Sequence, residues 1–415
     1  MNAKHQHAAT ASAVIILALL FIAQPGAHAE GYDWPQFRGM HRDGVSPETG
    51  LNFAWADSGP KEVWRRPLGD GYSAISVVGD RLYTMYAADH EGAPTEFAAA
   101  FDAATGDELW RVALGARKDT EFGNGPSSTP SVDGDTVYVL ASEGEFAALA
   151  TADGAVRWQM NLTEAFGSEV PTFGFSTSPL VDGDLLLVEG GGKEGKSYAG
   201  LDKKSGKVKW TLGETPAGYN SPLLVNMNGM KRYVYVVQGK LMCIDEKGKE
   251  IWSHEWPQGE THAMPIFVPP NKIYASGAEG VGAQLLSVKE SGKKAEVAEV
   301  WKNNFMRNHF SSAILHENHI YGFDNATLKS VAVEDSKMAW GKRGLGKGSL
   351  IFAEGHLLVL SDRGKLLAVE ATPDGYVEKS SVQALDGLCW TAPTLANGRL
   401  YLRNHEEMVA YDLTK

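Results

Sequence analysis

The stretch Ala100–Trp110, which reads Ala-Phe-Asp-Ala-Ala-Thr-Gly-Asp-Glu-Leu-Trp, decides the fold. It predicts a short apolar strand that ends at Asp102, a tight turn at Gly106 and a second strand that carries Trp110. Glycine supplies the positive φ that a hairpin turn needs, and the aspartate can accept hydrogen bonds from the turn amides. A tryptophan in this place buries a large ring between neighbouring sheets. The stretch is therefore a hairpin with a packing residue on its second strand.

This hairpin recurs along the chain, which indicates a repeat architecture. Further copies, some of them degenerate, lie at Leu149–Trp158, Leu201–Trp210, Ile244–Trp252, Val333–Trp340 and Val369–Gly375. A second unit precedes each copy and consists of small polar residues or proline, an apolar strand, a Gly/Asp/Asn turn and another strand. Its eight starts lie near Ile75, Pro130, Pro179, Pro222, Pro265, Ala313, Leu350 and Pro393.

Two hairpins per repeat give four antiparallel strands, which is one blade of a β-propeller. The aligned tryptophans recur about every 46 residues, as expected of propeller blades; they are Trp64, Trp110, Trp158, Trp210, Trp252, Trp301 and Trp340. We therefore predict an all-β, eight-bladed propeller of four-stranded antiparallel blades, whose eighth outer strand, around Val377–Val382, lacks the tryptophan. The final strand at Met408–Lys415 and the early strand at Lys61–Arg65 are expected to share one blade, because such closure of the ring removes free sheet edges.

The first residues are predicted to be an export signal. Lys4 precedes an apolar run at Ala13–Ala23, and Ala27-His28-Ala29 offers small residues for cleavage after Ala29. The run is too short to span a bilayer comfortably, and no later segment approaches 18 apolar residues. We expect residues 1–29 to be a signal peptide, residues 30–60 a lead-in segment and residues 61–415 the propeller of a periplasmic or secreted protein.

The composition excludes several classes of protein. A chain that is 43% hydrophobic and 22% charged can bury a core, and 2 cysteines are too few for a disulfide-stapled miniprotein. We expect Cys243 and Cys389 to be small buried residues. A formal net charge of −12 disfavours nucleic acid and anionic lipid as partners, and we expect a monomer without a transmembrane segment.

The Asp-x-x-Thr-Gly-x-x-x-Trp frame of residues 102–110 resembles the tryptophan-docking repeat of pyrroloquinoline-quinone (PQQ) β-propellers, and the resemblance covers nearly all of residues 30–415. That family includes PQQ-dependent alcohol and glucose dehydrogenases, and also propellers without a cofactor, such as the BamB family of outer-membrane assembly factors. The opening Trp34–Gly39 resembles the start of many uncharacterised exported members. The alcohol dehydrogenases carry adjacent cysteines over the cofactor and Glu, Asn and Asp calcium ligands, but this chain has no Cys-Cys pair and its loops show no matching ligands. The resemblance is therefore closer to the BamB-like members, although the chain lacks their lipid-bearing cysteine.

Alignment of the innermost strands places one residue per blade at the same height, three positions before each start. These residues are Tyr72, Ser127, Ser176, Tyr219, His262, Phe310, Lys347 and Trp390. We expect them to ring one mouth of the central channel, where aromatic side chains with His and Lys can stack on and polarise a planar ligand; a water-filled funnel without a ligand is the alternative. Arg307 and His309 can present a cationic cluster at the same mouth, suited to an anionic substrate or a partner's carboxylate, or they belong to a solvated loop.

The remaining motifs are interpreted as turns. His316-Glu317-Asn318-His319 lacks further zinc ligands, and Asp133-Gly134-Asp135 and Asp182-Gly183-Asp184 lack the remaining positions of a calcium loop. No nucleophile elbow, phosphate loop or His-Glu-x-x-His motif is present.

We therefore expect an exported, non-catalytic propeller that binds a protein or an envelope component, with no cofactor and no metal. Two alternatives stay open. One is a PQQ-dependent dehydrogenase of alcohols or sugars with calcium, in which Trp390 or another ring aromatic stacks on the cofactor. The other is a glycan-binding propeller.

Overall fold

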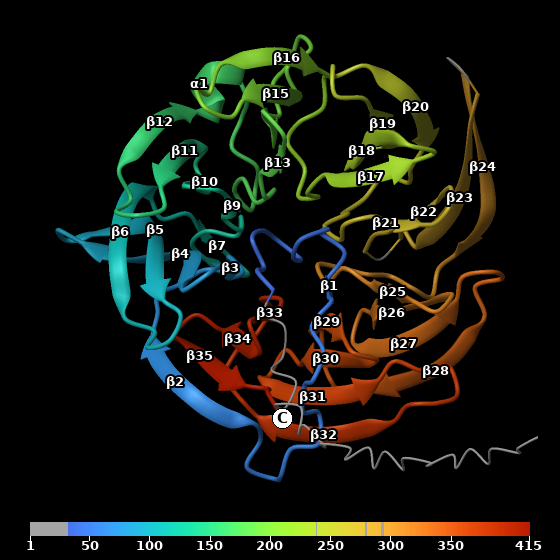
Figure 1. The fold of residues 1–415 in the computed structure, drawn as a ribbon. Coiled ribbons are helices and arrows are strands. Elements are labelled where there is room, and N and C mark those ends of the chain that lie inside the picture. Colours follow the sequence, from blue (N-terminus) through green and yellow to red (C-terminus); the bar gives the residue numbers. More distant parts are fainter. Residues whose placement is uncertain (1–31, 238, 279, 292–293) are drawn as a thin grey trace, which may run out of the picture.

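The computed structural model describes residues 32–237, 239–278, 280–291 and 294–415 and shows eight four-stranded antiparallel blades arranged around a central axis (Figure 1). The predicted eight-bladed propeller is confirmed. The predicted signal peptide lies outside the described residues. Within the described ranges the one helix is α1 (Leu162–Phe166), and no helix there is long and apolar enough to cross a membrane.

The blades follow one another along the chain, each from its innermost to its outermost strand. Blade 1 comprises β3 (Ser76–Val78), β4 (Arg81–His90), β5 (Ala93–Asp102) and β6 (Glu108–Ala116), and blade 2 comprises β9 (Ser131–Asp133), β10 (Thr136–Leu140), β11 (Glu145–Ala150) and β12 (Val156–Asn161). Blade 3 comprises β13 (Leu180–Asp182), β14 (Leu185–Glu189), β15 (Tyr198–Asp202) and β16 (Val208–Leu212), and blade 4 comprises β17 (Leu223–Met227), β18 (Met230–Val237), β19 (Lys240–Ile244) and β20 (Glu250–Glu255). Blade 5 comprises β21 (Ile266–Val268), β22 (Lys272–Ser276), β23 (Ala283–Ser291) and β24 (Lys294–Asn303), and blade 6 comprises β25 (Ile314–His316), β26 (His319–Asp324), β27 (Thr327–Ala332) and β28 (Met338–Arg343). Blade 7 comprises β29 (Ser349–Ala353), β30 (His356–Leu360), β31 (Lys365–Glu370) and β32 (Glu378–Gln383).

Blade 8 closes the ring with strands from both ends of the chain. It contains β33 (Thr394–Ala396), β34 (Arg399–Arg403), β35 (Glu407–Asp412) and, on the outside, β2 (Lys61–Pro67), which pairs antiparallel with β35. The predicted sharing of one blade by the two ends is confirmed. A separate two-stranded hairpin, β7 (Asp119–Thr120) and β8 (Gly123–Asn124), lies between blades 1 and 2 in the sequence.

The aligned tryptophans join neighbouring blades, as the repeat predicts. Six of them donate the indole N–H to a backbone carbonyl in the turn of the next blade, over 2.7–3.1 Å: Trp64 to Ala103, Trp110 to Thr151, Trp158 to Lys203, Trp210 to Glu246, Trp301 to Val333 and Trp340 to Thr372. The seventh, Trp252, has a buried indole N–H without a partner among the described residues. The blades are therefore connected by the same contact at most of their junctions.

The blade without a tryptophan is completed by the lead-in segment. Ser380 of β32 lies opposite Ala368, the place that Trp340 occupies opposite Ser330 in blade 6. The buried rings of Phe53 and Trp55 belong to the hydrophobic core that blades 7 and 8 share. Residues of the lead-in segment thus provide the apolar contacts that a docking tryptophan provides elsewhere.

Before Phe53, the lead-in segment crosses the channel, where β1 (Val45–Ser46) pairs in parallel with β29. Figure 1 shows this blue segment at the centre of the ring. The fully buried Arg42 donates to the carbonyls of Ser178 and Pro179 in blade 3, over 2.9 and 2.8 Å. Arg38 donates to the carbonyls of Ser312 and Ala313 in blade 6. The segment is therefore held to blades 3 and 6 by buried guanidinium groups, and it closes one end of the channel.

Candidate functional site

A cavity of about 370 Å³ lies over the inner ends of the blades, and all eight aligned positions line it. These are Tyr72, Ser127, Ser176, Tyr219, His262, Phe310, Lys347 and Trp390. The structure therefore brings together one residue from the start of each blade, which is the arrangement that the repeat alignment predicts. Arg307 is not among the lining residues, whereas His309 is.

Short hydroxyl side chains hold the starts of neighbouring blades together. The Thr129 hydroxyl accepts from the Ala74 amide over 3.1 Å, and the Ser178 hydroxyl accepts from the Thr129 amide over 3.0 Å. The Ser221 hydroxyl accepts from the Ser178 amide over 2.8 Å, and the Ser312 hydroxyl accepts from the Met264 amide over 2.9 Å. Because these bonds link blade to blade just below the aligned positions, they fix the ring residues on a rigid frame.

Aromatic and imidazole rings form a continuous circle around this cavity. The pairs, with the distances between ring centroids, are Tyr72–Trp390 (5.9 Å), Trp390–Phe310 (4.8 Å), Phe310–His309 (5.1 Å), His309–His262 (5.5 Å), His262–Tyr219 (4.9 Å), Tyr219–Phe173 (5.5 Å) and Phe173–Phe122 (5.6 Å). The Tyr72 hydroxyl donates to the Phe122 carbonyl and completes the circle. The cavity is therefore encircled by polarisable ring systems.

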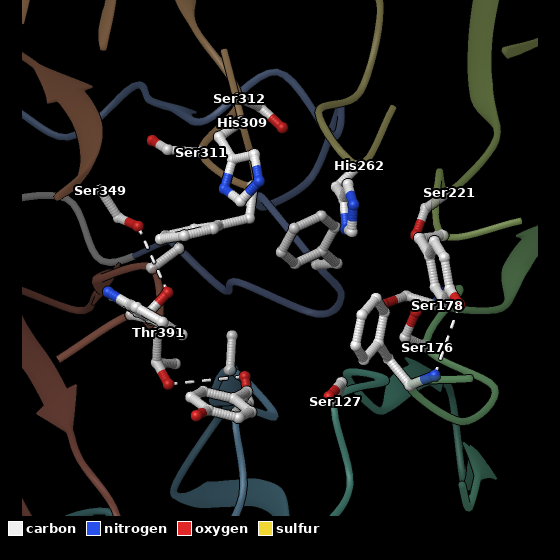
Figure 2. Close-up of a pocket in the computed structure, with 18 of the residues that line it drawn as sticks. Ser127, Ser176, Ser178, Ser221, His262, His309, Ser311, Ser312, Ser349 and Thr391 are labelled. Atoms are coloured by element: carbon white, nitrogen blue, oxygen red, sulfur yellow. Dashed lines mark hydrogen bonds between the residues drawn. The ribbon is translucent and has the colours of Figure 1, made fainter. Parts of the chain in front are cut away.

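Two histidines and one carboxylate form the ionisable part of the wall. The Nε2 atoms of His262 and His309 lie 3.5 and 3.6 Å from Glu260 Oε2, and Figure 2 shows both imidazoles extending into the cavity. Burial, and next the neighbouring His309, lowers the pKa of His262 to about 4. His262 is therefore neutral at pH 7 and can accept or donate a hydrogen bond without carrying charge.

The predicted cationic cluster is divided by the structure. Arg307 Nε lies 2.6 Å from Asp324 Oδ1, and Lys329 contacts Oδ2 of the same carboxylate. Asn308, between the two predicted residues, is fully buried and donates to the Phe323 carbonyl. Of the two candidates, His309 contributes to the cavity, and Arg307 forms an ion pair beside it.

The floor of the cavity comes from the lead-in segment, through Phe37 and Arg38. Arg38 Nη2 donates to the carbonyls of Asp43 and Ala313, each over 2.7 Å. Burial lowers the pKa of Arg38 to about 10, which still leaves the group charged at pH 7. The cavity is thus a funnel with one open mouth and a cationic floor.

Several lining residues escaped the sequence prediction. Phe122 lies on the β7–β8 hairpin and Phe173 in the segment before blade 3, both outside the repeat frame, so alignment of the repeats could not reveal them. Phe37 and Arg38 lie in the opening Trp34–Gly39 segment. No sequence pattern marks them. In the structure Arg38 and Arg42 both have positive φ, a conformation that nonglycine residues adopt only where contacts hold them.

A family model described as "Outer membrane protein assembly factor BamB" matches residues 95–342. The chain belongs to the BamB family. BamB of Yersinia pestis is 24% identical over 370 residues, covering 83% of this chain and 86% of that protein. BamB of Escherichia coli (strain K12) is 34% identical over 108 residues, covering 24% of this chain and 26% of that protein.

Solved structures show the same fold. BamB from Moraxella catarrhalis superimposes with a TM-score of 0.62 at 16% identity, covering 86% of this chain and 98% of that one. The quinohemoprotein alcohol dehydrogenase from Comamonas testosteroni superimposes with a TM-score of 0.61 at 12% identity, covering 92% of this chain and 80% of that one. The propeller is therefore shared by BamB and by quinoprotein enzymes, and the fold alone does not separate the two functions.

The funnel of this BamB-family chain does not fit a calcium-bound quinone. Calcium takes six to eight oxygen ligands, usually with several carboxylates. Glu260 is the single carboxylate among the described residues that line the funnel, and two histidines face it. The described part of the chain holds no group of three or more His, Cys, Asp or Glu residues that could bind a metal. His316–His319, Asp133–Asp135 and Asp182–Asp184 span hairpin turns, as predicted.

Proposed function

We propose that this BamB-family protein is an exported, non-catalytic binding module of the cell envelope that takes part in outer membrane protein assembly by binding a protein partner. The observation that carries the proposal is the match to a BamB over nearly the whole of both chains, 83% of this one and 86% of the Yersinia pestis protein. A match of that extent includes the blades and the loops between them, and not only a few shared repeats.

The channel mouth is the part of the surface that we assign to binding. Its frame is rigid, and its rim carries Phe122, which is 54% exposed at the tip of the β7–β8 hairpin. An exposed aromatic ring beside a cavity is typical of a binding surface, because burying it in a partner contributes favourable free energy with little loss of side-chain entropy. A partner loop or strand that covers the mouth would contact Phe122 first.

A quinone-dependent dehydrogenase is the competing function, and a titration separates the two. Purified protein is titrated with PQQ and calcium while absorbance is followed, and dye-linked oxidation of alcohols and sugars is then measured. We expect no saturable absorbance change at high micromolar cofactor and no dye reduction. Saturable binding together with dye-linked oxidation would contradict the proposal.

A further inference from the structure

We propose that the funnel binds the terminal ring of an acidic saccharide, with the sugar stacked on the aromatic circle and its carboxylate at Lys347. The proposal rests on the proposed function in one respect only, that the propeller binds its ligand without transforming it. Phe122 lines the funnel and also belongs to the proposed partner surface, so the two sites adjoin. The saccharide is therefore tested on the isolated protein, where its failure leaves partner binding, tested by cross-linking in cells, unaffected.

The charges in and around the funnel favour an anion. Lys347 lines the funnel, is half-buried, and has no ion-pair or hydrogen-bond partner for its ammonium group among the described residues. Arg38 forms the floor and donates to carbonyls. Among the described residues that line the funnel, the two cations Lys347 and Arg38 outnumber the single carboxylate, Glu260, in a protein with a net charge of −12.

The uncharged part of the wall suits a sugar ring. A pyranose presents C–H groups on its faces and hydroxyl groups on its edge. The aromatic circle supplies apolar surfaces for the faces. Hydroxyl groups suited to the edge come from the half-buried Ser127 and Ser176, both labelled in Figure 2. His262, neutral at pH 7, adds a group that can donate or accept.

The closed floor selects the end of a saccharide chain. Because the lead-in segment fills the channel below Phe37 and Arg38, a polymer cannot thread through the ring. A cavity of about 370 Å³ lies within the range of small-molecule sites, ~300–1,000 Å³. The funnel can therefore hold a terminal unit, while the rest of the chain leaves through the open mouth.

The test is isothermal titration of the full-length mature protein with three acidic trisaccharides, of galacturonate, glucuronate and mannuronate, each paired with its methyl ester. We expect saturable binding of at least one acid at pH 7 and at least tenfold weaker binding of its ester, because the ester cannot form the charge-assisted contact. The affinity for the acid should also fall as the salt concentration rises. Equal affinity for acid and ester would overturn the proposal, as would no saturable heat with any of the three acids up to 10 mM, a concentration we choose as the limit.

Two matched lysine variants locate the site. Lys347→Gln should weaken binding of the acid about tenfold and leave binding of the ester unchanged. Lys337→Gln, at an exposed lysine on the outside of blade 6, should change neither. Both variants should keep the wild-type thermal midpoint, which separates loss of binding from loss of folding. An unchanged affinity in Lys347→Gln would overturn the proposal, and so would displacement of the saccharide by PQQ at lower concentration, which would assign the funnel to a quinone.

Discussion

The indole of Trp64 packs on Gly106 of the following blade, and its Nε1 donates to the Ala103 carbonyl over 3.1 Å. Trp64 comes from the N-terminal strand β2, so this contact joins the closing blade to blade 1. Gly106 has a φ of +72°, and a Cβ at this position would lie 2.7 Å from the indole. The glycine of the repeat is therefore required twice, by the turn and by the ring that packs on it.

Gly106→Ala should destabilise the protein by about 2–4 kcal/mol, because the left-handed backbone and the collision with Trp64 both contribute. Gly134→Ala is the matched control, since Gly134 has a φ of +58° and no atom within 4 Å of an added Cβ. We expect about 1–2 kcal/mol there, from the backbone alone. Urea unfolding of both variants measures the difference, and equal shifts of the two midpoints would contradict the packing argument.

Phe53→Ala should destabilise the protein by about 3–5 kcal/mol, as for other large buried rings. Phe53 is 6% exposed and stacks on His356 with 4.1 Å between ring centroids, and its carbonyl accepts a 2.6 Å hydrogen bond from Ser380. The measurement is the thermal midpoint, compared with Met40→Ala at a residue that is 48% exposed. If the two substitutions have the same small effect, the lead-in segment does not replace the missing tryptophan.

Arg42→Met should cost about 2–3 kcal/mol, because it leaves the buried Ser178 carbonyl without its donor and the Pro179 carbonyl with the Ser131 hydroxyl alone. Arg157→Met removes an exposed ion pair with Asp135 and should change stability little. Limited proteolysis gives a second measurement, since release of the lead-in segment should expose it to cleavage in Arg42→Met alone. A stable, protease-resistant Arg42→Met variant would show that the segment is held by other contacts.

Glu48 should make stability depend on pH. Its carboxylate accepts from the Gly398 amide over 2.6 Å, and burial raises its pKa to about 7 from 4.5. The folded state therefore keeps this proton where the unfolded chain has lost it. The contribution of Glu48 to the free energy of unfolding therefore falls as the pH rises from about 4.5 to about 7, and it does not change further at higher pH. Glu48→Gln should lose less stability than the wild type between pH 5 and pH 8, measured by thermal midpoints. A parallel loss in both proteins would exclude Glu48 as the cause.

The fold could be predicted from the sequence because the repeat constrains it at many places at once. Each blade start lies within one residue of its predicted position, since a polar or proline start followed by an apolar strand and a glycine turn is a local signal. The two ends could be paired because the final strand ends at the point where its hairpin partner is missing. The same alignment identified all eight positions around the funnel.

The rest of the site depends on contacts without a local signal. Phe122 and Phe173 reach the funnel from insertions between blades, and Arg38 reaches it from a segment that precedes the repeat. Arg307 is separated from His309 because its guanidinium pairs with the carboxylate of Asp324, at the end of β26. The positions of these side chains depend on contacts that form when the ring closes, and the repeat pattern of the sequence does not contain that information.

Cross-linking in cells tests the binding function most directly. A photo-cross-linking residue is placed at Phe122, on the rim of the funnel, and in a second variant at Met338, which is 53% exposed on the outer strand β28. We predict that the residue at position 122 forms an adduct with a component of the outer membrane protein assembly machinery and that the residue at position 338 does not. An adduct of that component at position 338 alone, or none at position 122 in a folded and exported protein, would contradict the assignment of the funnel mouth as the binding surface.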